Sequence, residues 1–155
     1  GHYDHFKTLE EILKMYDVNC YLQKRAKDKI FDLNISYAKA FGCNKIPSID
    51  ESRFIFVNDN DLIKISSFNI RVLHTPGHTD DSVCYIIDNL LFSGDTLFKK
   101  SVGRTDLATG NTFKLMQSLI KIKKLKQDYI IYPGHDDATS LVSEKNHNPY
   151  LNKIN

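Results

Sequence analysis

The sequence predicts a layered domain of the α/β or α+β class, and three observations indicate this class. Short runs of β-branched and aromatic residues, separated by Asn-Asp and Ser-Ser turns, fill the middle of the chain. Segments with apolar residues on one helical face stand before and after these runs. The length of 155 residues suits one domain with a substantial core, so we assign residues 1–155 to a single domain.

In the first third of the chain, a helix is predicted to begin at Thr8. Thr8 is a residue type suited to capping, and apolar residues then recur on one helical face at Leu9, Ile12, Leu13 and Tyr16. Residues 18–22 are expected to form a short strand. The pattern from 24 to 45 is mixed, and a short helix is expected to end near Gly42.

The middle of the chain is predicted to be rich in strands. Three of them are expected at Arg53–Val57, Leu62–Ile65 and Asn69–His74. Residues 82–87 and 90–93 flank the turn dipeptide Asp88-Asn89, which is typical of a tight hairpin.

Helices and one strand are predicted for the last third. Residues 112–124 are expected to form a helix whose apolar side carries Phe113, Met116, Leu119 and Ile120. A short strand at 129–132 and a helix at 141–146 follow. We interpret the basic cluster in this region as a solvated helix face; it consists of Lys121, Lys123, Lys124 and Lys126.

The composition excludes several classes of protein. Lys and Arg number 21 against 19 Asp and Glu, and this net charge of +2 is too small to indicate a nucleic-acid partner or an acidic membrane surface. No apolar run approaches the length of a transmembrane helix. Cys20, Cys43 and Cys84 are odd in number and far apart, which favours reduced, mostly buried thiols in a cytoplasmic protein.

The chemistry is expected to lie in four groups of histidine and aspartate. His2, Asp4 and His5 stand close together, whereas His78, Asp95 and His135 each follow a predicted strand, beside a glycine. Loops that follow strands meet at one edge of a sheet, where a rigid scaffold presents functional side chains. Imidazole and carboxylate suit zinc, iron or manganese, and without thiolate ligands a structural zinc finger is not expected.

Each group by itself has an ordinary structural explanation. A single histidine is usually a surface residue, and Asp95 in a Gly-Asp-Thr turn could serve the turn alone. We expect His74 to order its loop and His147 to lie on the surface of the last helix. The prediction of a metal site therefore depends on the four groups occurring together.

With these residues, the sequence resembles the metallo-β-lactamase superfamily, whose members carry H-x-H-x-D-H followed by a His, an Asp and a final His. Longer phrases are similar to its glyoxalase II (hydroxyacylglutathione hydrolase) branch: LHTPGHT at 73–79, FSGDTLF at 92–98 and YPGH at 132–135. GRTD at 103–106 and NPYL at 148–151 resemble short bacterial members. The likeness runs from Gly1 almost to the C-terminus.

The resemblance implies an αββα sandwich and two divalent metal ions, with zinc expected first and iron or manganese as alternatives. It implies these ligands: His2 and His78 for the first ion, Asp4, His5 and His135 for the second, and Asp95 bridging both. Asp4 and Asp95 would also be the catalytic residues. Arg104 matches a basic position that contacts substrate in relatives, and a loop-ordering role for it stays equally open.

One departure from the family pattern leads to a further expectation. The histidine that precedes position 1 in the family is absent, so we expect a chain that is truncated at its N-terminus. Such a chain would lack one imidazole of the first metal site and the N-terminal half-sheet of the sandwich.

From the resemblance we expect a cytoplasmic hydrolase that cleaves a small-molecule thioester of the S-lactoylglutathione type with a metal-bound hydroxide. An iron-dependent persulfide dioxygenase shares much of this motif, and a lactonase or phosphodiesterase would use the same scaffold. A further alternative, which is not an enzyme, is that the chain is an inactive fragment that binds metal weakly. No nucleic-acid or membrane partner is expected, and the sequence leaves the oligomeric state open.

Overall fold

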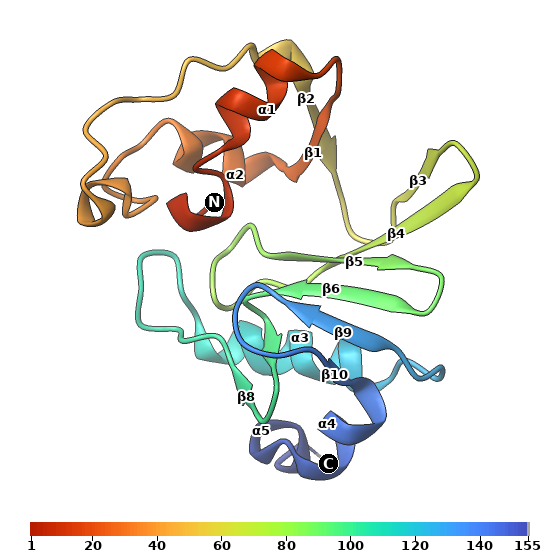
Figure 1. Ribbon diagram of the computed structural model, residues 1–155. Coiled ribbons are helices and arrows are strands. Elements are labelled where there is room, and N and C mark those ends of the chain that lie inside the picture. Colours follow the sequence, from red (N-terminus) through yellow and green to blue (C-terminus); the bar gives the residue numbers. More distant parts are fainter. Residues whose placement is uncertain (155) are drawn as a thin grey trace. The chain divides into compact units, whose positions relative to one another are not determined.

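A computed structural model describes residues 1–154 of the chain (Figure 1). The chain forms two compact units, Gly1–Val57 and Asn58–Asn155. The assignment of residues 1–155 to a single domain stays a prediction. Among the described residues, no helix is long and apolar enough to cross a membrane.

The first unit combines a small parallel sheet with short helices. Its elements are η1 (Tyr3–His5), α1 (Leu9–Met15), β1 (Cys20–Gln23), α2 (Lys24–Ile30), η2 (Ala38–Phe41), η3 (Glu51–Arg53) and β2 (Phe54–Val57). Strands β1 and β2 pair in parallel, with Cys20 opposite Phe54. Leu22, Ala26, Ile30 and Phe54 form the core of this unit.

The sequence predicted α1, β1, η2 and β2, but not helix α2 or the short 3-10 helices η1 and η3. The predicted helix after Thr8 and both strands are present, with ends shifted by one or two residues. Gly42 ends η2 with a φ of 78°, as expected of a glycine after a helix. Helix α2 escaped prediction because its first residue follows β1 directly and its capping side chain is Gln23, which accepts a hydrogen bond from Arg25 N.

The second unit is built on one six-stranded sheet in the order β10-β9-β6-β5-β4-β3. The strands are β3 (Leu62–Ile65), β4 (Phe68–His74), β5 (Val83–Ile87), β6 (Leu90–Gly94), β9 (Ile130–Pro133) and β10 (Thr139–Ser140). A separate two-stranded ribbon and three helices complete the unit: β7 (Leu97–Phe98), β8 (Ser101–Val102), α3 (Thr112–Lys123), α4 (Leu141–His147) and α5 (Pro149–Asn152).

Strand directions within this sheet bring three strand ends to the same edge. β4 is antiparallel to β5 and β5 is antiparallel to β6, so β4 and β6 run in the same direction. β9 is parallel to β6 and therefore shares that direction. The C-terminal ends of β4, β6 and β9 consequently lie at one edge of the sheet.

One face of the sheet carries the core of the second unit. Cys84 and Ile86 of β5 alternate with less buried neighbours, and Leu91 and Ile131 do the same on β6 and β9. They belong to one buried cluster with helical residues, among them Leu115, Leu119, Ile122, Leu141 and Leu151. Figure 1 shows α3 and α4 beside this sheet.

The predicted apolar side of α3 was wrong at one position. Phe113 is 71% exposed, whereas Leu115, Leu119 and Ile122 are buried, at the spacing i, i+4, i+7 of one helical face. Met116 and Ile120 pack only partly against the core. The buried face is therefore rotated away from Phe113, which lies in the first turn of the helix.

A buried glutamate holds the C-terminal elements to the rest of the unit. Glu144 of α4 is fully buried, and its carboxyl group accepts three hydrogen bonds. The donors are the backbone N–H of Lys100 (2.8 Å), the hydroxyl of Thr139 (2.7 Å) and the side-chain amide of Asn148 (2.9 Å). The turn between β7 and β8, strand β10 and the start of α5 thus share one acceptor group.

We expect Glu144→Ala to lower the free energy of unfolding by about 3 kcal/mol, because it leaves buried donors without their acceptor. Urea unfolding followed by circular dichroism measures this change. The exposed helical residue Glu11 provides the control: Glu11→Ala should change the free energy by less than about 0.5 kcal/mol. Equal midpoints for the two variants would contradict the structural role of Glu144.

Candidate metal centre

Three potential ligands meet at the edge where β4, β6 and β9 end. His78 follows β4, Asp95 follows β6 and His135 follows β9. Asp95 Oδ2 lies 3.3 Å from His78 Nε2 and 3.7 Å from His135 Nε2. The side chains of His78 and Asp95 are each 9% exposed, whereas that of His135 is 52% exposed. The Asp95 carboxylate therefore faces the buried imidazole of His78 and the solvent-exposed imidazole of His135.

Hydrogen bonds between the loops fix the spacing of these ligands. The hydroxyls of Thr75 and Thr96 lie 3.0 Å apart, which ties the loop after β4 to the loop after β6. Gly134 N donates to Gly94 O at 2.9 Å and ties the loop after β9 to the same point. The three ligand loops thus form one hydrogen-bonded group.

The buried thiol beside these loops is not a ligand candidate. Cys84 Sγ lies 3.3 Å from Thr75 Oγ1. Burial raises the pKa of the Cys84 thiol to about 11, so the thiolate that metals prefer is not formed near neutral pH. The expectation of buried thiols holds for Cys84 and is wrong for Cys20 and Cys43, which are only partly buried.

The hydrogen bonding of His78 fits a metal ligand. Its Nδ1 lies 2.7 Å from the backbone oxygen of Arg104. A carbonyl oxygen only accepts, so Nδ1 carries a proton, and in the neutral imidazole this leaves the lone pair on Nε2, on the Asp95 side. A metal-binding histidine is typically held in this way, with one ring nitrogen on a backbone carbonyl and the other on the ion. The donor set of two imidazoles and one carboxylate therefore fits a divalent transition metal.

Two glycines allow the backbone to pack closely around these ligands. A Cβ atom on Gly103 would lie 1.9 Å from Asp95 O and 3.1 Å from the Cβ of His78. A Cβ atom on Gly77 would lie 2.3 Å from the Cα of Leu115 on α3. The N-terminal end of α3 is anchored here as well, since Asn111 N donates to Gly77 O at 2.8 Å.

Arg104 has two separate roles in the structure. Its backbone oxygen orients His78, and its guanidinium donates two parallel hydrogen bonds of 2.6 Å to Asp106. These bonds, together with a backbone N–H, hold the pKa of Asp106 at about 2, so this exposed pair stays ionised at neutral pH. The side chain thus bonds a neighbouring residue of its own loop, as the loop-ordering alternative expects. A substrate contact stays a prediction.

The remaining predicted ligands lie on one turn of the first unit. His2, Asp4 and His5 belong to or adjoin η1, where His5 N donates to His2 O and Tyr3 N donates to Ser36 O. The ring of His2 meets that of Tyr37 edge-on, with centroids 5.4 Å apart. His5 Nε2 and Asp4 Oδ2 are 3.8 Å apart. The turn thus holds these three side chains within one short segment.

The other two histidines have the structural roles expected from the sequence. His74 Nε2 lies 3.0 Å from the backbone oxygen of Asp80 and so ties together the two ends of the loop that carries His78. His147 is exposed, and its Nδ1 lies 3.0 Å from Ser143 O in its own helix.

Comparison with known proteins identifies the family. The model of the metallo-beta-lactamase superfamily matches residues 1–135. The chain belongs to this superfamily. As a member of it, the protein is a metallo-hydrolase, and the superfamily supplies the divalent-metal chemistry that the donor set at the sheet edge fits. The resemblance stated from the sequence is thereby confirmed.

Individual relatives differ in their activities. Hydroxyacylglutathione hydrolase GloC of Haemophilus influenzae is 31% identical over 155 residues, which cover 98% of this chain and 73% of that protein. The crystal structure of BLEG-1 B3 metallo-beta-lactamase is also 31% identical, covers 97% of this chain and 73% of that chain, and superposes with a TM-score of 0.88. TTHA1623 in a di-iron-bound form is 28% identical over 97% of this chain and 73% of that chain, with a TM-score of 0.82.

These structural matches confirm the predicted fold class as that of the metallo-beta-lactamases. They do not select a substrate, because a hydroxyacylglutathione hydrolase and a metallo-beta-lactamase match this chain with equal identity.

Two features of the centre were missed by the sequence analysis. The close approach of Gly103 to Asp95 and the orientation of His78 by a backbone oxygen both come from the loop after β8. The phrase GRTD at 103–106 was a usable signal, but it was interpreted through the arginine side chain only. The glycine, the carbonyl and Asp106 contribute as much to the geometry.

We expect Gly103→Ala to destabilise the metal centre, because a Cβ atom there overlaps the backbone of Asp95. The free energy of unfolding should fall by about 3 kcal/mol, and metal affinity should fall with it. Gly42→Ala is the control, since nothing lies within 4 Å of its Cβ position and only its φ of 78° is unfavourable, at about 1 kcal/mol. Equal free energies of unfolding and equal metal affinities for the two variants would contradict the close contact of Gly103 with Asp95.

Proposed function

We propose that this protein hydrolyses small-molecule thioesters of the S-lactoylglutathione type in a metal-dependent reaction. The observation that carries the proposal is the arrangement of Asp95 against His78 and His135, with His78 Nε2 held as an acceptor by the Arg104 carbonyl. The similarity to a hydroxyacylglutathione hydrolase over 98% of the chain supports the thioester as substrate class.

The proposed metal ligands in the second unit are His78, Asp95 and His135. When bound, divalent ions would supply a Lewis acid that polarises the thioester carbonyl and lowers the pKa of water. The chain's own residues would position this chemistry: the Thr75–Thr96 and Gly134–Gly94 contacts hold the ligand loops at a fixed spacing. We propose zinc as the ion, and the di-iron form of TTHA1623 makes iron the first alternative to test.

His2, Asp4 and His5 are proposed as the further ligands, on the basis of the family motif. Their place on one turn supports this role, because the turn presents an imidazole–carboxylate–imidazole set within four consecutive residues, 2–5. Asp4 is also proposed to accept a proton from the attacking water, as its carboxylate is the acceptor in that set. A thiolate leaves readily, so no strong general acid is required for the leaving group.

Arg104 is proposed to contact an anionic part of the substrate. Its guanidinium is exposed and already oriented by Asp106, so a substrate carboxylate would meet it in a defined direction. The substrate carboxylate would then either replace Asp106 as the partner of the guanidinium or bind to the guanidinium beside Asp106.

Thioester hydrolysis is tested by following the ultraviolet absorbance of S-lactoylglutathione with the metal-loaded protein. We expect turnover by the wild type, and loss of turnover together with loss of bound metal in Asp95→Asn. An Asp95→Asn variant that is fully active and fully metallated would contradict the role of this residue.

Parallel assays distinguish the alternatives. Hydrolysis of a β-lactam without thioester hydrolysis would replace the proposed substrate class by that of BLEG-1. Oxygen uptake with glutathione persulfide by iron-loaded protein, again without thioester hydrolysis, would replace hydrolysis by oxygenation. Metal binding with none of these activities would favour the inactive fragment.

A further inference from the structure

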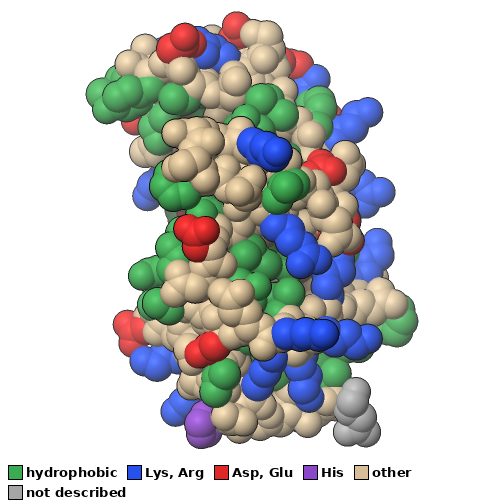
Figure 2. Space-filling view, turned by 90° about the vertical axis from the view of Figure 1, so that its right-hand side faces the viewer, with side chains coloured by type: hydrophobic (Ala, Val, Ile, Leu, Met, Phe, Trp, Pro, Cys, Tyr) green, Lys and Arg blue, Asp and Glu red, His purple; other side chains and the backbone are tan. Residues whose placement is uncertain are grey.

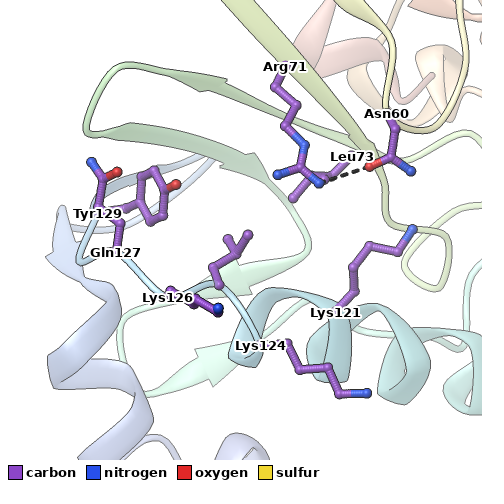
Figure 3. A pocket seen from close by; sticks show the side chains of 9 residues that line it. Asn60, Arg71, Leu73, Lys121, Lys124, Lys126, Gln127 and Tyr129 are labelled. Atoms are coloured by element: carbon purple, nitrogen blue, oxygen red, sulfur yellow. Dashed lines mark hydrogen bonds between the residues drawn. The ribbon is translucent and has the colours of Figure 1, made fainter.

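A second concave site lies within the unit Asn58–Asn155, and its lining is strongly basic. This pocket, here called the basic pocket, has a volume of about 500 Å³. Figure 3 shows Lys121 and Lys124 on one side of it, Tyr129 and Gln127 on the opposite side, and Arg71 reaching in from strand β4. Lys126 also lines it, so four of the nine lining residues are cationic.

Three separate segments supply these cations. Arg71 comes from β4, Lys121 from the last turn of α3, and Lys124 and Lys126 from the residues that follow α3. Lysines at a helix C-terminus ordinarily complement the helix dipole, but that explanation does not extend to an arginine on a neighbouring strand. Cationic residues from three segments therefore line one pocket, and this composition favours an anionic ligand.

The interpretation of the lysine cluster as a solvated helix face fits Lys124 and Lys126 but not Lys121 and Lys123. Lys123 is half-buried, and its Nζ donates to Leu151 O at 3.1 Å and to Ile154 O at 2.6 Å, away from the pocket. Lys121 is also half-buried and donates to His74 O at 2.7 Å. Only Lys124 and Lys126 are exposed.

The cations of the basic pocket are only partly neutralised. Lys121 Nζ lies 3.0 Å from both carboxylate oxygens of Asp59. Burial acts to raise the pKa of Asp59, but the bonds from Lys121 and from the His74 N–H outweigh it and lower the pKa. Arg71 donates to the neutral side chain of Asn60 at 2.9 Å, as drawn in Figure 3. No Asp or Glu of the described residues lines the pocket, so Arg71, Lys124 and Lys126 keep their net charge there.

We propose that the basic pocket binds a small organic anion that carries a diphosphate group. A guanidinium fork and flexible ammonium groups together suit several phosphate oxygens, and the volume lies within the range of small-molecule sites. Figure 2 shows Lys and Arg side chains gathered on one face of the protein. The net charge of the whole chain is only +2, so this concentration is local and fits a compact ligand better than a long polyanion.

The basic pocket is separate from the metal centre. Helix α3 begins beside the loop of His78, where Asn111 N donates to Gly77 O, and it ends at Lys123, between Lys121 and Lys124 of the pocket. Its 12 residues span about 18 Å, so Lys124 and Lys126 lie far from the start of the helix, although Lys121 reaches back to His74 O at the start of the His78 loop. None of the residues that line the pocket is a proposed metal ligand, and the proposal of a ligand here does not rest on the proposed hydrolysis.

The test is isothermal titration of the full chain with inorganic pyrophosphate at low ionic strength, followed by the same titration with ADP. We expect saturable binding of both, weakened about tenfold or more in Arg71→Ala and in the double variant Lys124→Ala/Lys126→Ala. The double variant Lys39→Ala/Lys114→Ala removes two exposed lysines outside the pocket and should bind as the wild type does. Unfolding midpoints check that all variants are folded.

Three outcomes would overturn the proposal. The first is no binding of either probe by the wild type. The second is that the pocket and control double variants behave alike. Equal weakening in both would mean that net charge attracts the probe, and unchanged binding in both would mean that the metal centre holds it. The third is binding of single-stranded DNA or of phosphatidylserine vesicles without binding of pyrophosphate, which would assign the basic face to a polymer or a membrane surface.

Discussion

The shared direction of β4, β6 and β9 is the constraint on which the metal centre depends. A strand delivers the residue after its C-terminal end to a defined edge, and here three strands with one direction deliver His78, Asp95 and His135 to the same edge. The parallel pairing of β6 with β9 matters most, because a hairpin would have sent His135 to the opposite edge. Helix α3 makes this pairing possible as the crossover between the two strands.

Backbone groups then fix the positions and orientations of the ligands that meet at this edge. The carbonyl of Arg104 sets the tautomer of His78, and Gly103 lets the same segment lie against Asp95. The threonine pair Thr75 and Thr96 joins two of the ligand loops. The geometry of the centre therefore depends on segments that carry no ligand themselves.

Much of the fold and of the site could be predicted because the signals are local. Alternating strands, the Asp88-Asn89 turn and the position of each ligand just after a strand can all be seen in short windows of sequence. The missed features depend on contacts between distant segments. The exposed side of α3 at Phe113 was set by packing against the sheet, and the basic pocket needed Arg71 of β4 beside lysines some fifty residues later, from 71 to 121.

The most direct test of this account is the metal content of the protein and its variants, measured by elemental mass spectrometry after equilibration with zinc or iron. The account predicts bound metal in the wild type and loss of metal in His78→Ala and His135→Ala. His147→Ala should keep the wild-type content, because that histidine is exposed and bonds only within its own helix. Wild-type protein without metal, or unchanged content in the two edge variants, would contradict the claim that the three strand ends form a metal centre.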